Sequence, residues 1–258
     1  MSATWYCCRQ RAGPLVKECR ALRPRFSPDD TAEDHAEKAR LKRYQRCAVN
    51  RKPVDRLELR LALIGEAGSM HTLTFDSEHL PQRFADVRTA LKNFFKRAQR
   101  WRISLDKPGP FDYLYAIEGL HGERRYHVHL ITDDRQLCPA EVSHLWQQGL
   151  VDNEPVLLGS GGYRRLAEYL NKERTDGHVI PIGRHPWSCS RTLGDRLDPP
   201  ERWRDSSGVI TVPDDAVWVR RSSVENDFGA YYFASWIERS SRATDYNRAQ
   251  ARAFNLEI

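Results

Sequence analysis

Asp112-Tyr-Leu-Tyr-Ala-Ile-Glu118 and Tyr126-His-Val-His-Leu130 are the stretches of this sequence that decide its fold. Both are β-prone, and a short glycine-containing segment separates them, which predicts a β-hairpin. Because side chains alternate across a strand, His127 and His129 point to the same face. If Glu118 lies opposite His127, its carboxylate joins the two imidazoles on that face.

Two imidazole nitrogens and one carboxylate oxygen would form an open site for a divalent metal ion, with positions left for water or substrate. This ligand set suits Mn²⁺ well and accepts Mg²⁺ more weakly, because Mg²⁺ prefers oxygen ligands. A His-x-His pair alone says little, since a strand histidine is more commonly a core residue with satisfied hydrogen bonds. The neighbouring carboxylate of Glu118 makes the pair a candidate metal site.

Tyr169 and Lys172 lie further along, on a helix expected from about Gly162 to Lys172. Their spacing of three places both on one helix face. A tyrosine hydroxyl, with a pKa of about 10, is a poor nucleophile. A nearby cation favours the phenolate, and a metal ion draws charge from the electrophile. A phosphodiester suits this pair best, because the metal ion and the ammonium would both engage its nonbridging oxygens.

A second tyrosine, Tyr163, lies on the same expected helix, six residues before Tyr169. Six residues correspond to about 600° of helical rotation, so the two side chains would lie about 120° apart around the helix. We therefore expect one nucleophile, Tyr169, with Tyr163 either packing in the core or stacking on DNA.

The hydrophobic pattern predicts further elements on both sides of the hairpin. An alternating β-prone run precedes it, followed by a helix whose apolar residues from Phe84 to Trp101 recur at helical spacing and face the core. The expected order is β, α, β, β, α, α over residues 70–75, 84–101, 112–118, 126–130, 138–146 and 162–172. This order predicts an α+β fold with a central antiparallel β-sheet and flanking helices.

We divide the chain into three parts. Residues 1–62 are polar and basic and are expected to be an extension. Within it, residues 28–44 are either a surface helix or a partly disordered arm, which tracks phosphates or faces solvent without a partner. Residues 63–200 contain the packed domain. Residues 201–258 are expected to be a C-terminal extension that packs on this domain, with an aromatic helix or strand at 228–237.

The chain has 258 residues, a formal net charge of +6 and a sequence pI near 9.0. A basic balance favours an acidic partner such as nucleic acid, although an excess of this size also serves solubility alone. No apolar run approaches the roughly 18 residues needed to cross a bilayer. The first residues also lack the apolar core of a signal peptide, so no membrane partner is expected.

The six cysteines are scattered along the chain. Cys7, Cys8, Cys19 and Cys47 share the N-terminal segment with His35, but they lack the paired short spacing of structural zinc sites. We therefore expect free thiols and a reducing, intracellular setting.

Together these motifs resemble those of the HUH endonucleases, in particular the rolling-circle replication initiators of bacterial phages, plasmids and integrative elements. The family's first motif resembles His71-Thr-Leu-Thr-Phe-Asp76, the second Glu118 to Leu130, and the third, Tyr-x-x-Lys on a helix, Tyr169-Leu-Asn-Lys-Glu173. Ser190-Arg-Thr-Leu193 is similar to a segment that follows the third motif in phage-type members. The resemblance covers roughly residues 70–195, and the order and spacing of the motifs make it specific.

The resemblance implies an RRM- or ferredoxin-like nuclease fold and a metal-dependent DNA endonuclease and strand transferase in the cytoplasm of a bacterial host cell. His127, His129 and Glu118 would be the ligands of Mn²⁺ or Mg²⁺. Tyr169 would attack a phosphate in single-stranded DNA at a replication origin, and Lys172 would orient or neutralise that phosphate. The products would be a 5′-phosphotyrosine and a free 3′-hydroxyl that primes replication. A host helicase is a second candidate partner.

Arginine side chains near these motifs are expected to contact the DNA, against the alternative that each is an ordinary surface charge. The candidates are Arg124, Arg125, Arg164, Arg165 and Arg191.

Three alternatives to a replication initiator stay open. A transposase or relaxase would use the same chemistry, although the tyrosine after the histidine pair disfavours the common relaxase arrangement. A catalytically inactive single-stranded-DNA-binding module could use the same scaffold without needing the whole residue set. A metal-dependent hydrolase would use the histidine pair and leave Tyr169 dispensable.

Overall fold

The computed structural model describes residues 4–23, 27–45, 49, 52–107, 109–119, 125–158, 162–172 and 187–238. The chain divides into two compact units, the first built from Met1–Leu59 and Leu197–Ser240 and the second centred on Arg60–Arg196. The predicted α+β class is confirmed. The described strands form two five-stranded sheets, one in each unit, and all neighbouring strands are antiparallel.

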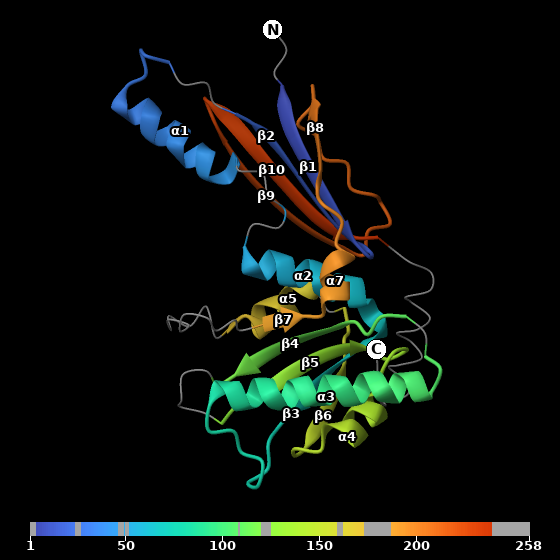
Figure 1. Ribbon diagram of the computed structural model, residues 1–258. Helices are drawn as coiled ribbons and strands as arrows, with labels where there is room; N and C mark the ends of the chain where they lie inside the picture. The colour runs from blue at the N-terminus through green and yellow to red at the C-terminus, as the bar shows by residue number, and fades with distance from the viewer. Residues whose placement is uncertain are drawn as a thin grey trace. The chain divides into compact units, whose positions relative to one another are not determined.

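The first unit contains a sheet of strands from both ends of the sequence. It pairs β8 (Glu201–Asp205), β1 (Trp5–Ala12), β2 (Leu15–Leu22), β10 (Gly229–Ile237) and β9 (Trp218–Asn226) in that order. Figure 1 shows this twisted sheet with helix α1 (Ala32–Gln45) beside it, in contact with β9 and β10. The helix confirms the first of the two interpretations of residues 28–44.

The predicted division into a basic extension, a packed domain and a C-terminal extension therefore needs correction at both ends. Residues 1–62 and 201–238 are not separate extensions, because β10 pairs with β2 and β8 pairs with β1. The N-terminal strands looked polar in sequence because β2 buries charged residues that find partners after folding. Lys17 is fully buried and forms an ion pair with Glu58 at 2.5 Å. Glu18, also buried, pairs with Arg9 at 2.6 Å and with Arg20 at 2.9 Å.

The cysteines also differ in part from expectation. Cys7, Cys8, Cys138 and Cys189 are free thiols, as predicted, but Cys19 is disulfide-bonded. Cys47 lies outside the described residues. Spacing along the sequence does not restrict which thiols a fold brings together. The disulfide removes one argument for a reducing compartment, which stays a prediction.

The boundary between the units falls within α2 (Pro53–Ile64). The second unit contains η1 (Gly65–Ala67), β3 (Gly68–Leu73), α3 (Phe84–Ser104), β4 (Tyr113–Glu118), β5 (His127–Asp133), α4 (Pro139–Trp146), β6 (Val151–Pro155), α5 (Gly162–Leu170), β7 (Trp187–Cys189) and α7 (Arg191–Asp195). The strand order is β6-β3-β5-β4-β7. All six elements predicted for residues 70–172 are present, and the edge strands β6 and β7 are additional.

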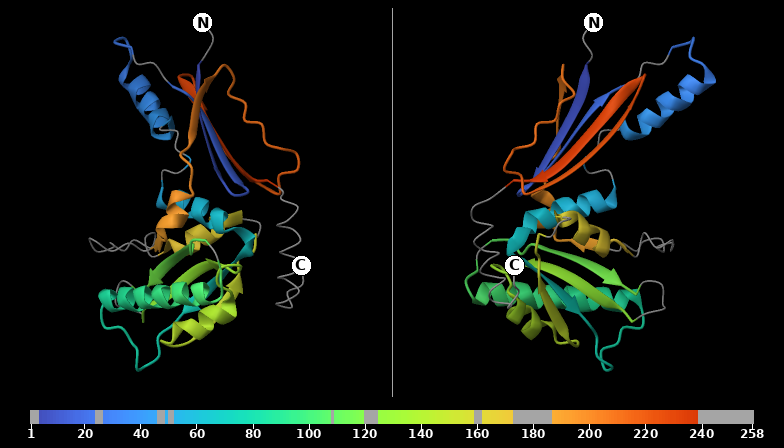
Figure 2. Two further views of the ribbon diagram at one scale, coloured as in Figure 1. Left: turned by 45° about the vertical axis from the view of Figure 1, so that its right-hand side comes forward. Right: turned by 180° about the vertical axis from the view of Figure 1, so that it is seen from behind.

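The two faces of this second sheet have different roles. One face packs against α3 and α4, where Leu73, Ile117, Val128 and Leu130 join the buried stripe of α3, which confirms the core assignment of that helix. Figures 1 and 2 show α3 and α5 on opposite sides of the sheet. Since side chains alternate, the neighbours of Val128 on β5 point toward the α5 side.

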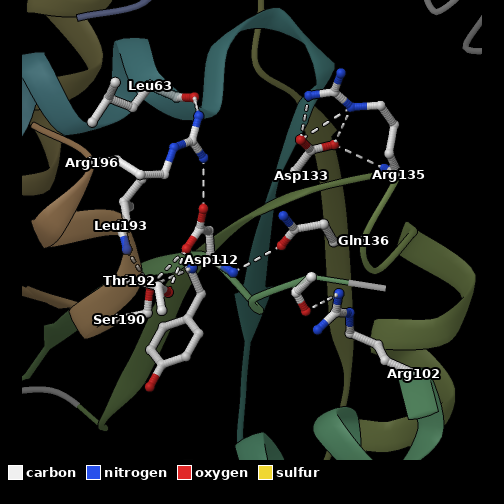
Figure 3. A network of polar contacts seen from close by, with 12 residues as sticks. Leu63, Arg102, Asp112, Asp133, Arg135, Gln136, Ser190, Thr192, Leu193 and Arg196 are labelled. Carbon is white, nitrogen blue, oxygen red and sulfur yellow. Dashed lines mark hydrogen bonds and ion pairs between the residues drawn. The ribbon is translucent and has the colours of Figure 1, made fainter. Parts of the chain in front are cut away.

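A polar network fixes the edge of the sheet at β7 and α7 (Figure 3). The buried Asp112 accepts hydrogen bonds from Thr192 Oγ1 at 2.5 Å and Arg196 Nη1 at 2.6 Å. Ser190 Oγ accepts a hydrogen bond from the Leu193 backbone at 3.2 Å and so caps α7. The Ser190–Leu193 segment therefore anchors the β7 edge next to the start of β4.

Candidate metal centre

The hairpin register brings the predicted ligands together. Glu118 lies directly opposite His127, and Ala116 lies opposite His129, which confirms the pairing assumed from the sequence. β4 ends at Glu118, followed by Gly119 at a φ of 86°, a left-handed conformation that glycine adopts without strain. Residues 120–124, including the candidate Arg124, lie outside the described residues. Glu118 and both histidines thus share the face of the sheet opposite α3.

The three side chains converge on one point. Oε2 of Glu118 lies 2.9 Å from Nε2 of His127, and Oε1 lies 3.0 Å from Nε2 of His129. One ligand atom from each residue lies within 4.8 Å of the others, and the described part of the chain contains no second group of this kind. Glu118 and His129 are buried, whereas the His127 side chain is 25% exposed. The cluster is therefore open to solvent at His127.

The partners of the other ring nitrogens favour tautomers that suit metal binding. Nδ1 of His127 lies 3.4 Å from the carbonyl oxygen of Arg125, which can only accept, so Nδ1 carries the proton. Nδ1 of His129 lies 3.1 Å from Oγ1 of Thr72, whose oxygen can accept the proton there. The contacts of the two Nε2 atoms with the Glu118 carboxylate are hydrogen bonds in which Nε2–H donates. A bound metal ion would take the place of these protons, as in sites where an outer partner orients a ligating histidine.

Thr72 was not among the predicted site residues. It lies on β3 opposite His129, in the run that resembles the first motif of the family. Strand alternation offers a signal for Thr72, because its side chain on the internal strand β3 must face either the core or the metal side. The sequence alone did not give the pairing of β3 with β5, which decides between the two.

The carboxylate in the cluster is held in its ionised form. Burial alone would raise the pKa of Glu118, but contacts with His127, His129 and Lys172 outweigh burial and hold this pKa well below its usual range. The contact with Glu118 raises the pKa of His127 in spite of burial. Oε1 of Glu118 is buried and lies 3.0 Å from Nε2 of His129 and 2.8 Å from Nζ of Lys172. An ionised carboxylate beside two imidazoles fits Mn²⁺ and more weakly Mg²⁺.

Helix α5 places the predicted nucleophile at this cluster. The Tyr169 hydroxyl lies 3.3 Å from Nε2 of His129, and the two rings meet edge to face with centroids 5.3 Å apart. Tyr169 is 42% exposed, so a substrate can reach its hydroxyl. The prediction that Tyr163 packs in the core is confirmed, since only 2% of Tyr163 is exposed. Stacking of Tyr163 on DNA is thereby excluded.

Lys172 contacts both the carboxylate and the tyrosine. Its Nζ lies 2.8 Å from Oε1 of Glu118 and 4.1 Å from the centroid of the Tyr169 ring. Burial lowers the pKa of Lys172, but the contact with Glu118 outweighs burial and raises it, so the side chain stays an ammonium. Because the ammonium occupies the oxygen that a metal ion would use, Lys172 and a metal ion compete for Glu118.

The candidate DNA-binding arginines take different positions. Arg165 lines a cavity of about 560 Å³ beside Tyr169, together with Met70, Thr72 and Glu154. Arg164 is largely buried and forms an ion pair with Glu168 at 2.6 Å. Arg125 is exposed two residues before His127. Arg191 is 94% exposed and lines a different groove. The structure therefore brings Arg165 to the tyrosine cavity and leaves Arg164 and Arg191 away from it.

Comparisons with known proteins found no relative of this chain. No family model, no curated protein and no solved structure matches this chain. Among the helices that the structure describes, none is both long and apolar enough to cross a membrane.

Proposed function

We propose that this protein is a metal-dependent endonuclease and strand transferase that nicks single-stranded origin DNA through Tyr169 and initiates rolling-circle replication. One observation carries the proposal. The Tyr169 hydroxyl lies 3.3 Å from Nε2 of His129, an atom of the candidate metal-ligand group. A tyrosine that only packed against the sheet would not need its hydroxyl at this nitrogen.

Two cations would act on the negative charge of the substrate phosphate, namely the metal ion held by the three ligands and the Lys172 ammonium. Glu118, His127 and His129 would hold Mn²⁺ or Mg²⁺, which when bound acts as a Lewis acid toward a nonbridging oxygen of the scissile phosphate. Lys172 lies over the Tyr169 ring and stabilises negative charge at the phenolate and at the phosphate. Tyr169 lies in the last turn of α5 and Lys172 two residues beyond its end, so both side chains reach the site from the same end of this helix.

The chemical step exchanges one phosphorus–oxygen bond for another. The phenolic oxygen of Tyr169 forms a bond to phosphorus, and the bond from phosphorus to the 3′-oxygen breaks. The phenolic proton passes to solvent, which reaches the half-exposed Tyr169, and the departing 3′-oxygen takes a proton from solvent. The products are a 5′-phosphotyrosine and a 3′-hydroxyl that a polymerase can extend.

The cavity beside Tyr169 supports an unpaired strand as the substrate. Its volume of about 560 Å³ falls in the range of sites that hold one small ligand, and so suits one unpaired nucleotide. Arg165, one helical turn before Tyr169, is placed to contact a neighbouring phosphate. Met70 and Leu157 offer apolar surface to a base.

The test is formation of a covalent adduct. The full chain is incubated with single-stranded oligonucleotides from its own origin, with Mn²⁺ or with EDTA, and the products are separated in SDS. We expect an SDS-resistant protein–DNA adduct with Mn²⁺, none with EDTA and none for Tyr169→Phe. Tyr163→Phe is the matched control on the same helix and should still form the adduct.

Two results would contradict the proposal at different levels. Cleavage that survives in Tyr169→Phe would replace the covalent mechanism with metal-dependent hydrolysis. Absence of any DNA binding would remove the DNA substrate altogether. A transposase or relaxase would form the same adduct, and release of single-stranded circles from an origin plasmid separates replication from those activities.

A further inference from the structure

A second groove lies on the opposite face of the same sheet. Its volume is about 900 Å³, and it runs between α3, the start of β4 and α7. Tyr113 and Tyr115 alternate along β4 with Leu114, Ala116 and Glu118, so their rings point toward α3 while Glu118 points toward the metal centre. The groove is therefore separate from the cavity beside Tyr169.

The floor of the groove is aromatic. Phe95 of α3 stacks on Tyr113, with ring centroids 3.8 Å apart and planes 11° from parallel. Tyr115 continues the row, with its ring centroid 6.3 Å from that of Tyr113 and a plane angle of 26°. Phe111 closes the other end, 5.3 Å from Tyr113. Each ring is held by its neighbours, so the half-buried tyrosines form a rigid platform.

The rim of the groove is cationic. Arg88, Lys92 and Lys96 are exposed and recur every fourth residue, which places them along one side of α3 over about 12 Å. None of the three forms an ion pair within the described part of the chain, and no carboxylate belongs to the described groove lining. Arg191 adds a fourth exposed cation from α7, which forms a long ion pair with Asp195 at 3.7 Å.

We propose that this groove binds single-stranded DNA as a second contact, with phosphates against the cations of α3 and α7 and unpaired bases on the aromatic platform. Stacking rings beside a row of cations are what proteins use to hold unpaired strands without reading their sequence. Cations spread over about two helical turns suit consecutive phosphates better than a single free phosphate. The inference rests on the proposed function only for the identity of the ligand, DNA, and does not depend on cleavage by Tyr169.

The experiment measures equilibrium binding without cleavage. A fluorescent single-stranded oligonucleotide is titrated with the full chain in EDTA, and anisotropy is recorded at several salt concentrations. The variants are the double charge reversal Lys92→Glu with Lys96→Glu, the single reversal Lys96→Glu, and Arg100→Glu as a control matched in charge to Lys96→Glu. Arg100 is exposed on the same helix but outside the groove. All three substituted side chains are exposed, and thermal unfolding checks that the folds are equal.

We expect the double variant to lose at least about tenfold in affinity. For this variant, the slope of log affinity against log salt concentration should be shallower by about 1.4, because two contacts are lost and each phosphate contact to a single strand contributes about 0.7. Arg100→Glu should change both quantities much less. Equal losses in Lys96→Glu and Arg100→Glu would overturn the groove and indicate non-specific attraction to a basic protein.

A second variant tests the aromatic platform. Tyr115→Leu keeps the charge of the groove and removes a stacking surface, so it should weaken single-strand binding and leave binding of the matching duplex unchanged. Equal weakening for both DNA forms would overturn stacking as the role of Tyr115. Binding of an acidic peptide as tightly as the single strand would overturn DNA as the ligand.

The two proposals fail separately. If the wild type forms the Mn²⁺-dependent adduct but the double variant binds DNA like the wild type, the groove is overturned and the proposed function stands. If the wild type forms no adduct while the double variant loses affinity, the groove stands and the tyrosine chemistry is overturned.

Discussion

The two faces of the sheet in the second unit each bury a histidine, with different consequences. His71 faces the α3 and α4 side, with Nδ1 2.7 Å from Asn153 Oδ1 and Nε2 2.8 Å from Thr132 Oγ1. His129 faces the α5 side, where Nε2 meets a carboxylate that His127 shares. Both ring nitrogens of His71 have neutral partners, so His71 is structural. His129 has one neutral partner and one anionic partner, which makes it a candidate metal ligand.

The surroundings also separate the two faces electrostatically. Burial lowers the pKa of His71 to about 4, so this ring stays neutral at ordinary pH. The Glu118 carboxylate raises the pKa of the partly exposed His127. Buried position alone therefore does not identify a functional histidine. A ring nitrogen directed at a carboxylate that a second histidine shares makes a histidine a candidate for function.

The largest expected effect comes from breaking the ligand face. His129→Ala should weaken Mn²⁺ binding by more than about 100-fold, the upper end of what loss of a partner outside the ligand set costs. Adduct formation should then fall to background. Isothermal titration with Mn²⁺ measures the affinity, and an affinity equal to that of the wild type would show that the cluster is not the metal site.

Lys172→Met tests whether the ammonium serves the chemistry or the ligand cluster. We expect the initial rate of adduct formation to fall by about 100-fold, the order found when one charge-stabilising group is removed. Mn²⁺ affinity should stay the same or rise, because the competitor for Glu118 Oε1 is gone. A matching loss of metal affinity and rate would instead assign Lys172 to holding the ligands in place.

His71→Asn should have the opposite profile to His129→Ala. Loss of the ring leaves buried partners unsatisfied, so the free energy of unfolding should fall by about 2 kcal/mol, within the range for such groups. Mn²⁺ affinity should not change. Urea unfolding and Mn²⁺ titration measure the two quantities, and a stable variant that binds Mn²⁺ poorly would reverse the assignment of the two faces.

The wild type should also lose stability in acid through His71. Its pKa is lower in the folded protein than in the unfolded chain, so the unfolded chain binds the proton more tightly. The contribution is fully present above pH about 6.5 and is lost as pH falls toward about 4. Comparing the pH dependence of urea unfolding for the wild type and His71→Asn, both in EDTA, isolates this contribution.

The smallest effect is the pH dependence of metal binding. A proton on His127 competes with the metal ion, and the raised pKa of His127 extends this competition above its usual range. Mn²⁺ affinity should therefore rise with pH until His127 is neutral, by up to about tenfold for each pH unit. Affinity independent of pH between about 6 and 8 would exclude His127 as a ligand.

Much of the candidate site could be predicted because its parts are close in sequence or regular in spacing. Strand alternation and a short hairpin placed Glu118 opposite His127, and the spacing of three placed Tyr169 beside Lys172. The contact of Lys172 with Glu118 could not be predicted, because it depends on how α5 packs on the sheet. Contacts between segments that lie far apart in the sequence leave no regular spacing from which they could be predicted.

The first unit was missed for a related reason. Strand β2 carries Lys17 and Glu18 at buried positions, which hides the alternation of polar and apolar residues that predicts a strand. Its neighbour β10 lies at the other end of the chain. The turn between β1 and β2 did carry a usable signal, since Gly13 has a φ of 53° and is followed by Pro14. Gly-Pro between two β-prone runs is a common turn sequence.

The most direct test of the whole account is to identify the residue that becomes attached to DNA. The adduct formed with Mn²⁺ is digested with nuclease and protease, and the modified peptide is sequenced by mass spectrometry. We expect a 5′-nucleotide linked to Tyr169, absent when EDTA replaces Mn²⁺. A nucleotide linked to any other residue, or a nicked oligonucleotide without any linked peptide, would contradict the assignment of the metal face as a tyrosine-nucleophile site.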